Sequence, residues 1–181
     1  MNIPNLLTLL RITLVPVIVI LLIQGSFFKA LIVYIAAGLT DVLDGFLARI
    51  LNQQTVLGSY LDPIADKALL VSSFVTLSVL HIIPGWLAVL VISRDLFILL
   101  GISVLSIMSI SVEMRPAFIS KITTALQLIT VLLRLSALCL TGPFNEMWFQ
   151  FLYWVTASFT IVSGLNYMAR GLRLINEDAE K

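Results

Sequence analysis

Long apolar runs fill almost the whole chain and are separated by short breaks rich in polar residues, proline or glycine. A helix needs about 20 apolar residues to cross the hydrocarbon core of a bilayer. Six runs meet this length, at residues 3–23, 27–51, 60–80, 86–110, 117–140 and 147–167. The pattern predicts an all-α integral membrane protein with six transmembrane helices.

The first run differs from the others because polar side chains follow one edge of its opening turns. Asn5, Thr8 and Arg11 recur every three residues, and Pro16 lies further along. Residues at this spacing share one face of a helix. We therefore expect a short amphipathic segment near the membrane interface, then a bend at Pro16 and the first span.

Composition agrees with a membrane protein. Hydrophobic residues make up 60% of the 181 residues and charged residues only 12%, whereas soluble domains carry about 25% charged residues. The mean hydropathy is +1.07. A net charge of +1 without a basic run gives no reason to expect a nucleic-acid partner. The length predicts one membrane-embedded domain, residues 1–181, ending in a charged tail at residues 170–181.

The distribution of Lys and Arg predicts the orientation. Six spans would place both ends of the chain and the loops after residues 51 and 110 on one side. That side holds Arg49, Arg115, Lys121, Arg170, Arg173 and Lys181, whereas the opposite loops hold Lys29, His81 and Glu146. Because Lys- and Arg-rich loops stay in the cytoplasm, we expect a multi-pass protein of the cell (inner) membrane.

Four carboxylates interrupt the second and third runs. Asp41 and Asp44 are three residues apart, and Asp62 and Asp66 are four apart, so each pair shares one face of its helix. Pro63 is expected in the first turn of the third helix, where its missing N–H matters little. A turn between the runs would bring the two pairs opposite each other, toward the cytoplasmic side. Intramembrane acids cost several kcal/mol unless paired, which makes them candidates for function.

Such a cluster needs positive charge beside it, because like charges repel. Hard oxygen ligands suit Mg²⁺ or Mn²⁺, and a single Cys and a single His argue against a zinc site. Two divalent cations held by shared carboxylates are a recurring device of phosphoryl transfer. A structural alternative is that the acids join two helices, with Lys67 or Arg49 as their partner.

The spacing D-x2-D-G-x2-A-R-x8-G-x3-D-x3-D resembles the signature of the CDP-alcohol phosphatidyltransferases, membrane enzymes of phospholipid synthesis. Its fixed positions are met by Asp41, Asp44, Gly45, Ala48, Arg49, Gly58, Asp62 and Asp66. The resemblance implies that an alcohol attacks CDP-diacylglycerol and that CMP is released. It also implies two Mg²⁺ or Mn²⁺ ions bound by the four acids, with Asp66 acting in addition as general base on the acceptor hydroxyl.

The resemblance extends to the substrates. It assigns contacts with the CDP-linked lipid to Asn5, Thr8, Gly45, Ala48, Arg49, Thr55 and Gly58. Arg94 and Lys121 are the cations available to bind an acceptor phosphate. Two alternatives stay open, namely that Arg94 forms an internal pair with Asp95 and that Lys121 only extends to the lipid headgroups.

Different segments of the chain resemble two groups of the family, and these groups use different acceptor alcohols. The opening NIPNLLTLLR resembles phosphatidylglycerophosphate synthases, whose acceptor is glycerol 3-phosphate. The segments ISRD (92–95) and PAFISKITTALQ (116–127) resemble cardiolipin synthases, whose acceptor is phosphatidylglycerol. We expect glycerol 3-phosphate, with phosphatidylglycerol as the alternative, and a homodimer, as is usual for the family. A divalent-cation transporter would also explain buried acids, but not the small residues and the arginine at family spacing.

Overall fold

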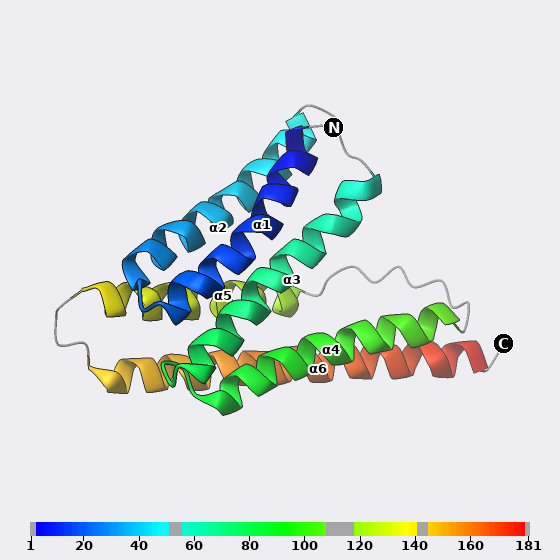
Figure 1. Ribbon diagram of the computed structural model, residues 1–181. Helices are drawn as coiled ribbons and strands as arrows, with labels where there is room; N and C mark the ends of the chain where they lie inside the picture. The colour runs from blue at the N-terminus through cyan, green and yellow to red at the C-terminus, as the bar shows by residue number, and fades with distance from the viewer. Residues whose placement is uncertain (1–2, 51–55, 108–117, 141–144, 180–181) are drawn as a thin grey trace. The chain divides into compact units, whose positions relative to one another are not determined.

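Six α-helices make up the computed structural model (Figure 1), which describes the backbone of residues 3–50, 56–107, 118–140 and 145–179. Side chains are described for residues 6–41, 43, 61–103, 105, 107, 118–140 and 145–173. The helices are α1 (Ile3–Ile23), α2 (Phe27–Ile50), α3 (Val56–Val79), α4 (Gly85–Ile107), α5 (Phe118–Cys139) and α6 (Glu146–Ala179). The prediction of an all-α protein is confirmed.

Three of these helices are long and apolar enough to cross a membrane, judged on the residues that the structure describes. Their apolar windows are Leu6–Ile23 in α1, Gly85–Ser103 in α4 and Phe118–Cys139 in α5. Many of their large apolar side chains are exposed on the protein surface, as expected for helices that face lipid. The finding supports an integral membrane protein, and further spans at α2, α3 and α6 stay predictions.

The two prolines lie inside helices. The expected amphipathic segment is not separate from the first span, because α1 runs without interruption from Ile3 through Pro16. The placement of Pro63 in the first turn of its helix is wrong, because α3 already begins at Val56. Each proline lacks the N–H that would bond the carbonyl four residues earlier, and both helices continue past the missing bond.

The charged tail is also helical. The apolar pattern predicts the end of the last span at residue 167, whereas α6 extends to Ala179. Arg, Leu, Glu and Ala in this segment are good helix formers, so the helix does not need an apolar face to persist. The end of a span and the end of a helix are therefore different positions here.

Two helices end in the same hydrogen-bonded turn. After α1, Gly25 has a φ of 69° and the N–H of Ser26 donates to the carbonyl of Leu21 at 2.9 Å. After α3, His81 has a φ of 57° and the N–H of Ile82 donates to the carbonyl of Leu77 at 2.9 Å. This is the Schellman arrangement, in which a left-handed residue reverses the chain. Glycine adopts it freely, but histidine does so at a cost.

The chain divides into two compact units. The first, Met1–Gly85 with Val131–Phe144, contains α1, α2 and α3. Helix α1 packs against both α2 and α3, and small buried residues such as Ala30, Ala37 and Ala65 let the backbones approach closely. Arg134 belongs to this unit too, and its Nε donates to the carbonyl of Ile82 at 3.1 Å.

The second unit, Trp86–Thr130 with Asn145–Lys181, contains α4, α6 and residues 118–130 of α5. Buried polar side chains join α5 to α6. Thr123 Oγ1 donates to the carbonyl of Phe159 at 3.1 Å, and Gln127 Nε2 donates to Thr160 Oγ1 at 3.2 Å. One turn further, the hydroxyls of Thr130 and Thr156 are 2.8 Å apart. Such hydrogen bonds between helices satisfy polar groups that lipid cannot.

Candidate active site

Three of the four predicted acids are described, and they lie where α2 and α3 face α1. Asp41 comes from α2, and Asp62 and Asp66 come from successive turns of α3. All three side chains are half-buried. Their carboxylates reach a common edge of α1, because the four-residue spacing of Asp62 and Asp66 puts both on one helix face. Asp41 and Asp66, which come from two different helices, contact the same side chain of α1, whereas Asp62 contacts a neighbouring one. That these acids act together as metal ligands stays a prediction.

The edge of α1 that meets the acids carries Thr8 and Arg11. Thr8 Oγ1 donates to Asp62 Oδ1 at 2.6 Å. Arg11 Nη1 forms an ion pair with Asp41 Oδ1 at 2.7 Å, and the same nitrogen donates to Asp66 Oδ1. Both Thr8 and Arg11 are fully buried. One cation therefore lies against carboxylates from two different helices.

Arg11 is the residue of this site that sequence reasoning missed. The three-residue spacing marked it as a polar position on the same edge as Thr8, but assigned it no partner. The structural alternative for the acids named Lys67 or Arg49 as the compensating cation, and the structure adds Arg11, which contacts both Asp41 and Asp66.

The donor set suits a hard divalent cation. Carboxylate oxygens of Asp41 and Asp66 are already within contact of a single charged nitrogen, and oxygen ligands are those that Mg²⁺ and Mn²⁺ prefer. Among the side chains that the structure describes, no three from His, Cys, Asp and Glu gather into one metal-sized group. The fourth predicted ligand, Asp44, lies outside those side chains.

Several other predicted contacts with the CDP-linked lipid lie outside the described side chains. Asp44, Gly45, Ala48 and Arg49 fall within the residue range of α2 and Gly58 within that of α3. Side chains are not described at these positions or at Asn5, and Thr55 lies outside the described residues altogether. Their roles stay predictions. Thr8 is the one member of the predicted group whose side chain is described.

The predicted acceptor-binding residues both lie in the second unit. Arg94 is buried on α4, where Nη1 donates to Asp95 Oδ1 at 2.6 Å. Nη2 donates to the hydroxyls of Ser120 at 2.6 Å and Ser163 at 2.8 Å. This is the internal pair that sequence analysis left open. Lys121, by contrast, is exposed on α5.

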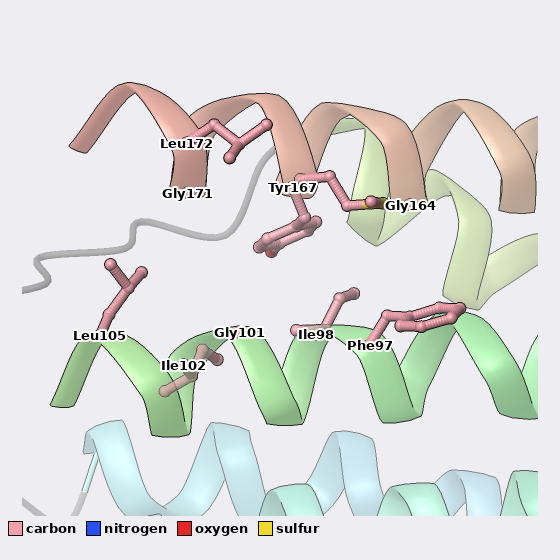
Figure 2. Close-up of a pocket in the computed structure, with 10 residues that line it drawn as sticks. Phe97, Ile98, Gly101, Ile102, Leu105, Gly164, Tyr167, Gly171 and Leu172 are labelled. Carbon is pink, nitrogen blue, oxygen red and sulfur yellow. The ribbon is translucent and has the colours of Figure 1, made fainter. Parts of the chain in front are cut away.

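An apolar cavity of about 250 Å³ lies between α4 and α6, within the second unit. Figure 2 shows its walls, with Phe97 and Leu105 on α4 and the ring of Tyr167 pointing toward them from α6. Gly101 and Gly171 leave the cavity open, because nothing lies within 4 Å of the position that a Cβ atom would take at either. The Arg94 guanidinium carbon is 6.0 Å from the centre of the Tyr167 ring. A charged group therefore adjoins the apolar space.

These features define a class of protein, namely a helical membrane protein with an acidic site closed by one edge of its first helix. The sequence pattern of the CDP-alcohol phosphatidyltransferase family matches residues 1–162, and the chain belongs to this family. The resemblance stated from the motif is confirmed.

Relatives with two kinds of names match most of the chain. The human cardiolipin synthase (CMP-forming) is 36% identical over 96% of this chain, and its rat counterpart is 35% identical over the same share. The chain spans 63% of the length of each. The CDP-diacylglycerol–glycerol-3-phosphate 3-phosphatidyltransferase of Bacillus subtilis is 33% identical over 93% of this chain and 94% of its own length. A probable phosphatidylglycerophosphate synthase of Mycobacterium tuberculosis is 34% identical over 95% of this chain and 82% of its own length.

Proposed function

We propose that this protein is a membrane enzyme of phospholipid synthesis that transfers a phosphatidyl group from CDP-diacylglycerol to an alcohol. The observation that carries the proposal is the meeting of Asp41, Asp62 and Asp66 at the Thr8–Arg11 edge of α1. Carboxylates from two helices that share one cation form an arrangement suited to a doubly charged pyrophosphate and its counter-ions. Family membership supports the same activity.

Asp41, Asp44, Asp62 and Asp66 are the residues that would hold two divalent cations, Mg²⁺ or Mn²⁺. When bound, such cations would neutralise the pyrophosphate of the substrate and stabilise charge that develops on the phosphoryl oxygens. The carboxylate oxygens of the three described acids fit this role by chemistry, and two of the acids, Asp41 and Asp66, already share one positive charge.

The protein's own side chains would accept the proton and contact the substrate. An acceptor hydroxyl oxygen attacks the phosphorus that bears the diacylglycerol, and the bond from this phosphorus to the oxygen bridging it to CMP breaks. CMP leaves with the electron pair, and Asp66 takes the hydroxyl proton as general base. Thr8 lies one turn from Arg11 and offers a hydroxyl near the acids, which suits its predicted contact with the CDP group.

Glycerol 3-phosphate is the first candidate for the acceptor. Relatives whose names specify that product or substrate match this chain over most of their own length, 94% in Bacillus subtilis and 82% in Mycobacterium tuberculosis. The predicted contacts for its phosphate are Arg94 and Lys121. This acceptor is small and carries two charges, so it requires a polar site rather than an apolar one.

Phosphatidylglycerol is the second candidate, and two observations favour it. The human and rat cardiolipin synthases are 36% and 35% identical to nearly the whole chain. In addition, the apolar cavity between α4 and α6 adjoins Arg94 through the Tyr167 ring. An apolar space beside a cation is what a lipid with one phosphodiester charge would use.

The proposal places the enzyme in the cell (inner) membrane with six spans, as a homodimer, and with its site open to the cytoplasm. The apolar character of α1, α4 and α5 supports the membrane location. The excess of Lys and Arg on one predicted side supports the orientation.

The decisive test is CMP release by the purified full chain in detergent or lipid nanodiscs. CDP-diacylglycerol is supplied with glycerol 3-phosphate, phosphatidylglycerol or no acceptor, in Mg²⁺, in Mn²⁺ and in excess EDTA. We expect acceptor-dependent CMP release that stops in EDTA and returns with either cation. Full activity in EDTA would contradict the metal role, and turnover with phosphatidylglycerol alone would replace the first acceptor by the second. Cation uptake into vesicles without CMP release would favour the transporter instead.

A further inference from the structure

Arg11 is a fully buried cation for which the proposed chemistry has no use. It lies on α1 with an exposed side-chain fraction of 0%, and its Nη1 contacts carboxylate oxygens of both Asp41 and Asp66. A buried guanidinium is stable only with opposite charge beside it. The acids supply that charge, and the guanidinium in turn reduces the repulsion between them. Arg11 thus does for these carboxylates what a bridging metal ion would do.

The Arg11 guanidinium and a divalent cation would compete for the same two carboxylates, those of Asp41 and Asp66. Asp66 Oδ1 accepts a hydrogen bond from Arg11, and a divalent cation that binds this carboxylate closely is repelled by the guanidinium charge beside it. Asp41 Oδ1, 2.7 Å from the same nitrogen, is affected in the same way. Both oxygens belong to residues predicted as metal ligands.

We propose that Arg11 is a built-in counter-ion of the acidic site, which holds the place of the divalent cations and is displaced from Asp41 and Asp66 when they bind. The proposal rests on the metal dependence of the proposed function and adds a residue that regulates it. Metal binding exchanges one charge fixed on α1 for mobile charges of the same sign. The carboxylates therefore keep a counter-charge in both states, and the site does not depend on metal to remain folded.

The exchange also affects Thr8. Thr8 and Arg11 are three residues apart on α1 and both bond to predicted metal ligands, Thr8 through Asp62 at 2.6 Å. Displacing Arg11 loosens the edge of α1 that holds Thr8 against Asp62, and frees the Thr8 hydroxyl for the substrate. Metal binding would then precede and favour binding of the CDP-linked lipid.

The test measures metal binding without turnover. The unfolding temperature of the full chain in nanodiscs is recorded while Mg²⁺ or Mn²⁺ alone is titrated from an EDTA-treated state, for the wild type and for Arg11→Met, Arg11→Lys and Arg134→Met. A ligand that binds the folded state raises this temperature with a midpoint set by its affinity. Arg134→Met is the matched control, because Arg134 is a cation of the same unit whose Nε donates to the carbonyl of Ile82.

We expect Arg11→Met to lower the unfolding temperature in EDTA and to shift the metal midpoint to a lower concentration. If Arg11 occupies the site in nine of ten molecules, removing it tightens apparent binding by about tenfold, since apparent affinity scales with the competent fraction. Arg11→Lys should shift the midpoint in the same direction by a smaller factor, because its ammonium is a single point of charge. Arg134→Met should lower stability equally with and without metal and leave the midpoint unchanged.

Each other outcome has one meaning. If Arg11→Met is unfolded in EDTA and recovers in Mg²⁺, the proposal stands; if it stays unfolded in both, Arg11 is only structural and the proposal is wrong. An unchanged or weakened metal midpoint in the folded Arg11 variants would overturn it as well. A wild-type protein that shows no metal-dependent shift would overturn both this proposal and the metal role in the proposed function, which distinguishes that failure from failure at Arg11 alone.

Discussion

Replacing Arg94 decides whether its charge serves the fold or the acceptor. Arg94 and Asp95 are 7% and 8% exposed and are joined at 2.6 Å, so Arg94→Met leaves a buried carboxylate without its arginine. Breaking a buried pair from one side costs about 3–5 kcal/mol. For a chain of this length, that corresponds to a fall of roughly 6–20 °C in unfolding temperature. The hydroxyls of Ser120 and Ser163 lose a donor in the same variant.

A companion variant removes both charges. Arg94→Met with Asp95→Leu should unfold close to the wild-type temperature, because apolar residues of similar volume often replace a buried pair without loss. Lys121→Met is the control for stability alone, since an exposed lysine contributes within about 0.5 kcal/mol. The assay is thermal unfolding in nanodiscs, followed by the CMP-release KM for glycerol 3-phosphate at a temperature where all variants are folded.

The two measurements separate stability from binding. Equal losses in the single and double variants, or no loss in Arg94→Met, would refute the reasoning that the ion pair stabilises this unit. If the stable double variant keeps its KM for glycerol 3-phosphate, the prediction that Arg94 binds the acceptor is wrong. A KM raised strongly in both Arg94 variants, with CDP-diacylglycerol binding unchanged, would show that Arg94 has both roles.

Two further predictions concern Asp66 and His81. Asp66→Asn keeps the shape but removes the proton acceptor, so kcat should fall by ~10²-fold or more while CDP-diacylglycerol binding weakens far less; equal losses in both would leave Asp66 as a metal ligand only. His81→Gly should raise the unfolding temperature by about 2–4 °C without changing kcat, because glycine removes a left-handed strain of roughly 1 kcal/mol at φ 57°. Gly25→Ala, at φ 69°, should lower that temperature, and the opposite result at either position would contradict the assignment of strain.

Much of the fold could be predicted because lipid imposes a simple pattern. The second and fifth apolar runs, at residues 27–51 and 117–140, agree with α2 (Phe27–Ile50) and α5 (Phe118–Cys139) within one residue at each end. The pattern failed where a helix extends beyond the apolar segment, at the start of α3 and the end of α6. Helical backbone hydrogen bonds can continue through polar sequence, so the hydrophobic pattern does not predict where such a helix begins or ends.

The site was predictable only within each helix. Three- and four-residue spacing placed the acids on helix faces, and it placed Thr8 and Arg11 on one edge of α1. It could not say which acid each would contact, because those partners are 54 and 55 residues away along the chain. The long side chain of Arg11 can reach acids on more than one helix, and only the packing of the helices determines which acids it contacts. Arg11 was therefore recognised as polar and not as part of the site.

The hydroxyl and amide contacts between α5 and α6 have a consequence for motion. Thr123, Gln127 and Thr130 recur at three- and four-residue intervals and each meets a partner on α6, at Phe159, Thr160 and Thr156. Sliding one helix along the other by a single turn, about 5.4 Å, would separate all three pairs at once. Helices α5 and α6 should consequently resist sliding and move together.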